Sequence, residues 1–226
     1  MVIVVESEVV EINYVGRIKN TGEIFDLTDK EKADEEGLST DEMELGPVKV
    51  FLGEGYILEG LDKKIKEMEA GEEKTVEVPK EEAFGSRKGE NIKTISKREF
   101  EKYDVNPRRG MPVEVDGMRG KILTVTSGRV KVDFNHPLAG RDLEYEVEVI
   151  REVEDVEEQV EAVLDFHLNG DYELEVDGGN VVIKLDQDFG EELVEKLEEE
   201  VEKLEKVEKA EVQVEKQGED DEDEED

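Results

Sequence analysis

The sequence predicts an α+β protein built from several small domains, and three features of the 226-residue chain support this class. Residues 9–79 read as short strands with a single amphipathic helix. Residues 86–136 contain further short strands separated by glycine-containing turns. After about residue 153, helical and alternating patterns follow one another, which indicates a C-terminal α-β-β-α-β domain that can just support its own core.

The first block opens with a strand pattern that is rich in β-branched residues. Residues 9–18, VVEINYVGRI, are expected to form this strand, and Gly22 in NTGE suits the positive φ of a turn. A short second strand follows at residues 24–27. Residues 28–45 are almost entirely polar and predict an excursion or a long loop, after which residues 46–53, GPVKVFLG, return to strand.

The helix of the first block is predicted to begin near Tyr56. Apolar residues recur there at spacings of three and four, which places them on one stripe: Leu58, Leu61, Ile65 and Met68. Gly71 is a plausible C-terminal stop, and the alternating strand EKTVEVP ends at Pro79.

The middle of the chain predicts a small β-rich module. Residues 96–105, SKREFEKYDV, predict a short helix capped by Ser96, and residues 111–134 predict three strands. A long strand follows after NHPLAG. Its alternation places four residues on one face: Leu143, Tyr145, Val147 and Val149.

The C-terminal part alternates between the two periodicities. Residues 153–168 are helical, with Val153, Val156, Val160, Val163 and Leu164 on one stripe. A hairpin turns at residues 177–180, a second helix covers residues 190–207, and KAEVQVEK is expected to be a last strand. Residues 217–226 carry no apolar residue, so this acidic tail is predicted to be disordered.

Composition excludes several classes of function. Lys and Arg number 30 against 66 Asp and Glu, which gives a net charge of −36 and predicts no binding to nucleic acid or anionic membranes. The absence of cysteine excludes disulfides and thiol catalysis. The N-terminus lacks the basic start of a signal peptide, and no apolar run reaches the roughly 20 residues of a membrane span. A cytoplasmic location is therefore expected.

A metal centre or another cofactor is not predicted. His136 and His167 are the only histidines, whereas a metal site usually needs several clustered ligands. His136, which precedes Pro137, is expected to make a local hydrogen bond, and His167 ends an apolar helix.

The order of motifs resembles one family. NYVG, FD, VFLGEGYILEGLD, VEVPKEEAFG and a late LEYEVEV resemble the FKBP-type peptidyl-prolyl isomerases over roughly residues 1–152. The segment between AFG and NHPLAG resembles the insert-in-flap domain of SlyD-like members, and the C-terminal unit resembles the long archaeal members. The resemblance implies an antiparallel half-barrel around one helix. It divides the chain into an isomerase domain (1–85 and 137–152), an insert (86–136), a C-terminal domain (153–216) and the tail (217–226).

The resemblance also implies a site without cofactor, in which an apolar pocket holds a proline-containing segment. The residues that match the family pocket are Tyr14, Phe25, Asp26, Val50, Ile57, Leu58, Leu61, Phe84 and Tyr145. Leu61 stands where many relatives carry an aromatic floor, and Phe84 stands where Tyr is common. Asp26 would organise the pocket through hydrogen bonds, and Tyr14 would orient the substrate backbone.

Taken without the flanking motifs, these residues have simpler interpretations. Apolar residues at helical spacing are core residues in about four cases in five. Tyr14 alone would be an ordinary strand aromatic, and Asp26 a strand-end or turn residue.

The predicted function is a proline isomerase with folding-helper activity, whose insert captures unfolded polypeptides. Apolar candidates in the insert are Ile92, Ile95, Phe100, Tyr103, Val105, Met111, Met118, Ile122, Leu123, Val125, Val130, Val132 and Phe134. Some of them must form its core, and Met118 suits varied partners. Two alternatives stay open: a holdase with an inactive pocket, and an assembly protein that forms a homodimer through its C-terminal helices.

Overall fold

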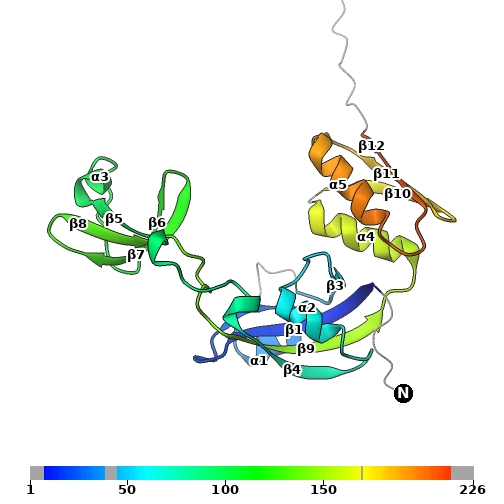
Figure 1. Cartoon of the computed structure of the whole chain (residues 1–226), viewed down its shortest axis with the longest axis horizontal. Coiled ribbons are helices and arrows are strands. Elements are labelled where there is room, and N and C mark those ends of the chain that lie inside the picture. Colours follow the sequence, from blue (N-terminus) through cyan, green and yellow to red (C-terminus); the bar gives the residue numbers. More distant parts are fainter. Residues whose placement is uncertain (1–7, 39–44, 169, 215–226) are drawn as a thin grey trace, which may run out of the picture. The chain divides into compact units, whose positions relative to one another are not determined.

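The computed structural model describes residues 8–38, 45–168 and 170–214 (Figure 1). The chain divides into two compact units. Unit 1 contains residues 1–15, 26–76 and 145–226, and unit 2 contains residues 16–25 and 77–144. The predicted tail at residues 217–226 and the first seven residues lie outside the described residues.

The largest sheet has five strands, in the order β2-β1-β9-β4, with β3 also paired to β1. Its strands are β1 (Val9–Ile18), β2 (Ile24–Leu27), β3 (Val48–Phe51), β4 (Glu73–Val78) and β9 (Leu143–Glu152). β3 runs antiparallel to β1, so that Val10 faces Val50. The one-face prediction for β9 is confirmed, because Leu143, Tyr145, Val147 and Val149 are all buried.

The predicted loop over residues 28–45 is wrong in part, because a short helix forms within it. This helix, α1 (Lys30–Glu35), begins after Asp29, whose carboxylate accepts hydrogen bonds from the backbone N–H groups of Glu31 and Lys32. The cap and the complete burial of Ala33 outweigh the polar composition that suggested a loop. Residues 39–44 lie outside the described residues.

The helix that was predicted to begin near Tyr56 begins three residues later, as α2 (Glu59–Ile65). Leu58 is its N-cap, with an extended backbone (ψ 138°) and no side-chain cap. Gly53 and Gly55 adopt φ of 95° and 83°, which only glycine accepts readily, so a turn directly precedes Tyr56, and residues 56–58 are not yet helical. The predicted stripe is buried at Leu61, Ile65 and Met68.

The C-terminal part of unit 1 forms the predicted α-β-β-α-β order. Its elements are α4 (Val156–His167), β10 (Tyr172–Asp177), β11 (Asn180–Leu185), α5 (Glu191–Val201) and β12 (Lys209–Val214). The hairpin turns between Asp177 and Asn180 as predicted, and β12 pairs in parallel with β11. The second helix is shorter than the predicted 190–207, although Leu204 beyond its end is still buried.

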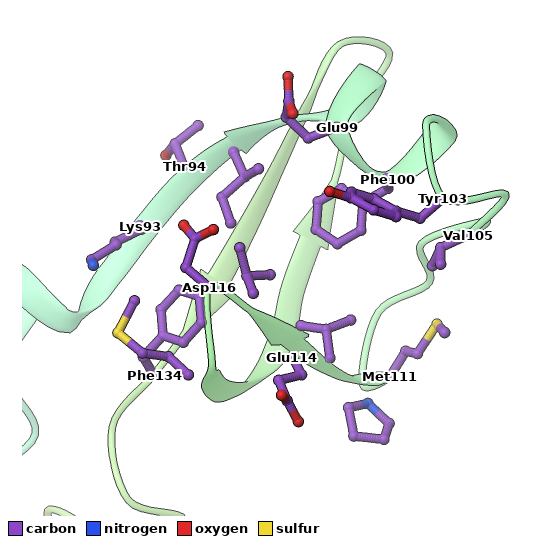
Figure 2. Close-up of a pocket in the computed structure, with 15 residues that line it drawn as sticks. Lys93, Thr94, Glu99, Phe100, Tyr103, Val105, Met111, Glu114, Asp116 and Phe134 are labelled. Carbon is purple, nitrogen blue, oxygen red and sulfur yellow. The ribbon is translucent and has the colours of Figure 1, made fainter.

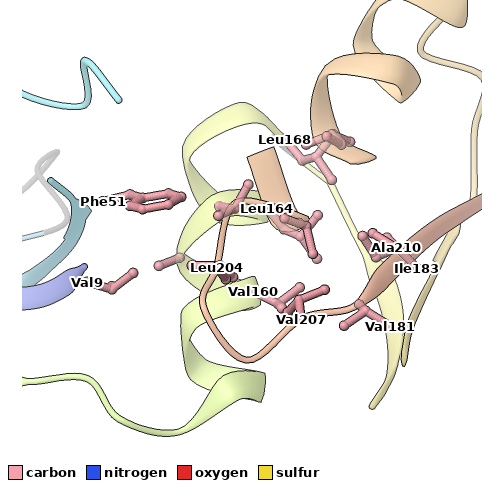
Figure 3. Close-up of a cluster of buried hydrophobic side chains, with 14 of the residues drawn as sticks. Val9, Phe51, Val160, Leu164, Leu168, Val181, Ile183, Leu204, Val207 and Ala210 are labelled. Atoms are coloured by element: carbon pink, nitrogen blue, oxygen red, sulfur yellow. The ribbon is translucent and has the colours of Figure 1, made fainter. Parts of the chain in front are cut away.

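One hydrophobic core joins this α/β part to the large sheet within unit 1. Val160, Val163, Leu164, Leu197 and Val201 of the two helices share it with Val9 and Phe51. Figure 3 shows Val9 and Phe51 pointing from β1 and β3 toward Leu164 on α4. The C-terminal part is therefore packed against the first strands of the chain.

Unit 2 contains a separate four-stranded sheet in the order β5-β8-β7-β6. Its elements are β5 (Ile92–Ser96), α3 (Lys97–Glu101), β6 (Pro112–Val115), β7 (Met118–Val125) and β8 (Arg129–Asp133), preceded by the short 3-10 helices η1 (Lys80–Glu82) and η2 (Gly89–Asn91). The Ser96 cap is confirmed, since its hydroxyl accepts from the N–H of Arg98. Strand β5 was not predicted. The hydrophobic core of this four-stranded part contains Phe100, Ile122, Val130 and Val132.

Candidate functional site

The structure brings three of the predicted site residues together on neighbouring strands of unit 1. The Tyr14 hydroxyl donates a 2.9 Å hydrogen bond to Asp26 Oδ2. The rings of Tyr14 and Tyr145 lie edge to face, with centroids 5.8 Å apart. Two bonds to Thr28 fix the register beside them. Tyr14 N donates to the Thr28 side-chain Oγ1, and Thr28 N donates to Tyr14 O, both at 2.9 Å.

Burial keeps both tyrosines in this cluster protonated. It raises the pKa of Tyr14 well above its ordinary value, and the neighbouring Asp26 carboxylate raises that pKa further. The pKa of Tyr145 is raised by the same two causes, burial first. Tyr14 therefore keeps its proton and donates it in a hydrogen bond to Asp26, while the hydroxyl oxygen still has lone pairs that can accept a hydrogen bond.

A groove of about 420 Å³ lies next to this cluster, entirely within unit 1. We call it the unit 1 groove. Three predicted pocket residues, Tyr14, Val50 and Ile57, line it. The remaining lining residues come from the strands, the turn before α2, and α4: Glu11, Pro47, Val48, Lys49, Tyr56, Ala162, Asp165 and Phe166.

The other predicted site residues do not line this groove. Leu61 is only 2 % exposed, and Leu58 is half-buried at the start of α2. Phe25 and Phe84 belong to unit 2. There the Phe84 ring stacks on His136 with centroids 4.1 Å apart, and His136 Nδ1 accepts from Leu138 N, which confirms the predicted local hydrogen bond of His136.

The insert contains a second groove, of about 610 Å³, which we call the insert groove. Figure 2 shows Phe100 and Tyr103 at one end of it and Phe134 at the other. Tyr103 is 80 % exposed and Met118 is 39 % exposed, whereas Ile95, Val105, Met111 and Val113 are partly buried around the core. The groove therefore presents apolar side chains that the insert's own core does not use.

Sequence reasoning missed a contact between Tyr56 and the C-terminal part. The Tyr56 ring stacks on Phe166 with centroids 3.9 Å apart, and its hydroxyl donates a 3.1 Å hydrogen bond to Glu200 Oε2. His167 Nε2 lies 2.8 Å from the same carboxylate oxygen. The apolar cluster before α2 indicated that Tyr56 has a structural partner. Nothing in the sequence indicates which residues, more than 100 positions away, that partner would include.

Among the described residues, no three His, Asp or Glu side chains gather in a way that could hold a metal ion. No helix in the described ranges is long and apolar enough to cross a membrane.

Comparison with known proteins places the chain in a family. Residues 3–106 match the family described as FKBP-type peptidyl-prolyl cis-trans isomerase. The short-type peptidyl-prolyl cis-trans isomerase of Methanocaldococcus jannaschii is 34 % identical over 154 residues, which cover 68 % of this chain and 96 % of that protein. The chain belongs to the FKBP-type peptidyl-prolyl cis-trans isomerases. It also has the α+β architecture that the motif order predicted.

The insert of this FKBP-type isomerase is matched separately. Residues 93–138 match the family described as FKBP26, IF domain, which supports the resemblance to an insert-in-flap domain. The SlyD isomerase of Treponema pallidum is 32 % identical over 160 residues, covering 65 % of this chain and 78 % of that protein.

Proposed function

We propose that the Tyr14, Asp26 and Tyr145 cluster and the apolar residues around it catalyse cis-trans rotation of Xaa-Pro bonds in folding polypeptides. The observation that supports this proposal is the Tyr14–Asp26 hydrogen bond beside a groove lined by Val50 and Ile57. Leu58 and Leu61 complete the proposed pocket in this unit.

An apolar pocket suits this reaction, which forms and breaks no covalent bond. Rotation has a barrier of about 18–20 kcal/mol because it removes the resonance of the C–N bond. The twisted amide separates less charge than the planar amide. An apolar wall deprives the planar amide of water and therefore holds the twisted amide relatively better.

Tyr14 and Asp26 would position the substrate backbone. Asp26 accepts the hydrogen bond of the Tyr14 hydroxyl and so fixes the direction of that hydroxyl. The hydroxyl oxygen is then free to accept an N–H of the bound chain, which holds the proline over the apolar wall.

The insert groove would bind unfolded segments before their prolines reach the pocket. Its exposed aromatic and methionine side chains can adapt to many sequences, since Met118 is flexible and Tyr103 is 80 % exposed. Tethering a captured chain to the same molecule raises the local concentration of its prolines. Protein substrates should therefore gain more than short peptides.

The test is the refolding rate of a protein whose folding is limited by proline isomerisation, with catalytic amounts of four proteins. These are the full chain, Asp26→Ala, Tyr103→Ala with Met118→Ala, and a deletion of residues 86–136. The deletion is sterically feasible because Gly140 N donates a 2.7 Å hydrogen bond to Gly85 O. Leu123→Ala is the matched control, since Leu123 is a half-buried insert residue that does not line the groove.

Strong acceleration of refolding by the full chain and by Leu123→Ala would support the proposal if it is lost in three variants. These are Asp26→Ala, the double variant Tyr103→Ala with Met118→Ala, and the deletion of residues 86–136. Deletion of the insert should leave isomerisation of a short peptide largely intact. Suppressed aggregation without any acceleration would instead favour the holdase, in which the insert groove works and the pocket does not.

A cytoplasmic location and a homodimer formed through the C-terminal part are also proposed, as the sequence suggested. Light scattering on the full chain and on a chain ending near residue 152 tests the dimer. A dimer that persists after truncation would contradict this assignment.

A further inference from the structure

We propose that α4 of the C-terminal part supplies a wall of the substrate groove, with Phe166 and Asp165 selecting a basic side chain near the proline. This inference rests on the proposed isomerase function and adds a substrate preference to it. The unit 1 groove already contains Tyr14, Val50 and Ile57 of the proposed pocket. It also contains Ala162, Asp165 and Phe166, so it is continuous from the pocket to α4.

Phe166 is held in a fixed position but remains open to solvent. Its ring stacks on Tyr56 with an angle of 18° between the planes, yet 51 % of its surface is exposed. A phenylalanine exposed at the end of this amphipathic helix costs solvation free energy unless it meets a partner. Tyr56 stacks on one face of the ring, and Phe166 also lines the unit 1 groove.

Two contacts to one carboxylate keep α4 in place beside the pocket. The Tyr56 hydroxyl donates to Glu200, a carboxylate on α5 with a side chain only 8 % exposed. His167, the neighbour of Phe166, lies 2.8 Å from the same carboxylate. Because Tyr56 directly precedes Ile57, these contacts fix the pocket wall and the Phe166 ring relative to one another.

The charges in the groove favour a cation. Its lining contains two carboxylates, Glu11 and Asp165, and one cation, Lys49. Lys49 is already paired with Glu161 at 3.4 Å, and Glu11 is already paired with Arg151 at 2.6 Å, so Asp165 is the carboxylate that a bound cation can meet. Asp165 is exposed, and its carboxylate accepts a 2.8 Å hydrogen bond from the neutral Tyr172 hydroxyl.

A basic side chain of the substrate fits the Phe166 ring and the Asp165 carboxylate better than an acidic or an apolar side chain does. An arginine or lysine can lay its apolar stem or its cation on the Phe166 ring and still reach a carboxylate. An acidic residue would be repelled by the Asp165 carboxylate. The occupant is therefore an arginine or lysine within one or two positions of the isomerised proline.

The experiment compares isomerisation of proline peptides that differ only beside the proline, with Arg, Leu or Glu at that position. The full chain is compared with Asp165→Asn, Phe166→Ala, Phe166→Tyr and Glu157→Gln. Glu157→Gln is the matched control, because Glu157 is an exposed carboxylate of α4 that does not line the groove. Phe166→Tyr keeps the ring and should restore the behaviour that Phe166→Ala loses.

The full chain should favour the Arg peptide over the Glu peptide by about threefold to tenfold in kcat/KM. Asp165→Asn should reduce that ratio by about threefold, and the ratio should also shrink at high salt. Phe166→Ala should raise KM for the Arg and Leu peptides with little change in kcat, which a general loss of stability would not do.

Two results would overturn the inference, and they are distinguishable. Equal rates for the three peptides, with clear catalysis, would contradict the basic preference and leave the isomerase function standing. No acceleration of any peptide by the full chain would contradict the isomerase function and this inference together.

Discussion

Removing the hydroxyl of Tyr56 should destabilise unit 1 by a measurable amount, because that hydroxyl joins the turn before α2 to α5. The Tyr56→Phe variant keeps the ring on Phe166 and loses only the hydrogen bond to Glu200. A hydrogen bond to a charged group contributes about 1.5–3 kcal/mol. At 3.1 Å the bond is long for its type, and Glu200 keeps His167 as a partner, so the lower figure applies.

The free energy of unfolding should therefore fall by about 1.5 kcal/mol, and the midpoint of thermal unfolding by roughly 3–6 °C for a chain of this size. Tyr56→Ala also removes the ring and should cost about 3 kcal/mol. Circular dichroism during urea and thermal unfolding measures both changes. Tyr103→Phe is the control, because it makes the same chemical change at a tyrosine that is 80 % exposed.

A change of less than about 0.5 kcal/mol in Tyr56→Phe, equal to that of Tyr103→Phe, would refute the reasoning. The hydroxyl would then contribute nothing to holding α4 and α5 against the turn. The positioning of Phe166 would have to come from apolar contacts alone.

Three further predictions concern the proposed pocket. Tyr14→Phe should lower kcat/KM for a proline peptide by about tenfold, because a charge-assisted bond to Asp26 is lost; unchanged catalysis would remove the hydroxyl from the mechanism. Leu61→Ala should reduce the free energy of unfolding by about 2–4 kcal/mol in urea, since it leaves a cavity at a side chain that is 2 % exposed; a loss below 1 kcal/mol would mean that the pocket floor collapses around it. Folding raises the pKa of Tyr14 and Tyr145, so the unfolded chain loses these protons first, and the free energy of unfolding should fall as pH rises above the ordinary tyrosine value of 10.0. Unfolding in urea at several alkaline pH values measures this slope, and a rising stability there would contradict the sign.

The sequence determined the periodic elements, because their signals are local. The alternation of β9, the hairpin at Asp177–Asn180 and the Ser96 cap all depend on residues within a few positions of one another. The motif order was equally informative about the family. Errors occurred where short-range effects compete, at the Asp29 cap of α1 and at the glycine turn that delays α2.

Only the tertiary structure decided which apolar residues are core and which face a groove. Phe100 and Tyr103 are three positions apart in sequence, yet Phe100 is buried and Tyr103 is 80 % exposed. Phe166 meets Tyr56 across more than 100 residues because the packing of α4 against Val9 and Phe51 brings them together. Periodicity reports the face of an element, whereas a contact between distant elements depends on how the whole chain packs, and no local pattern records that.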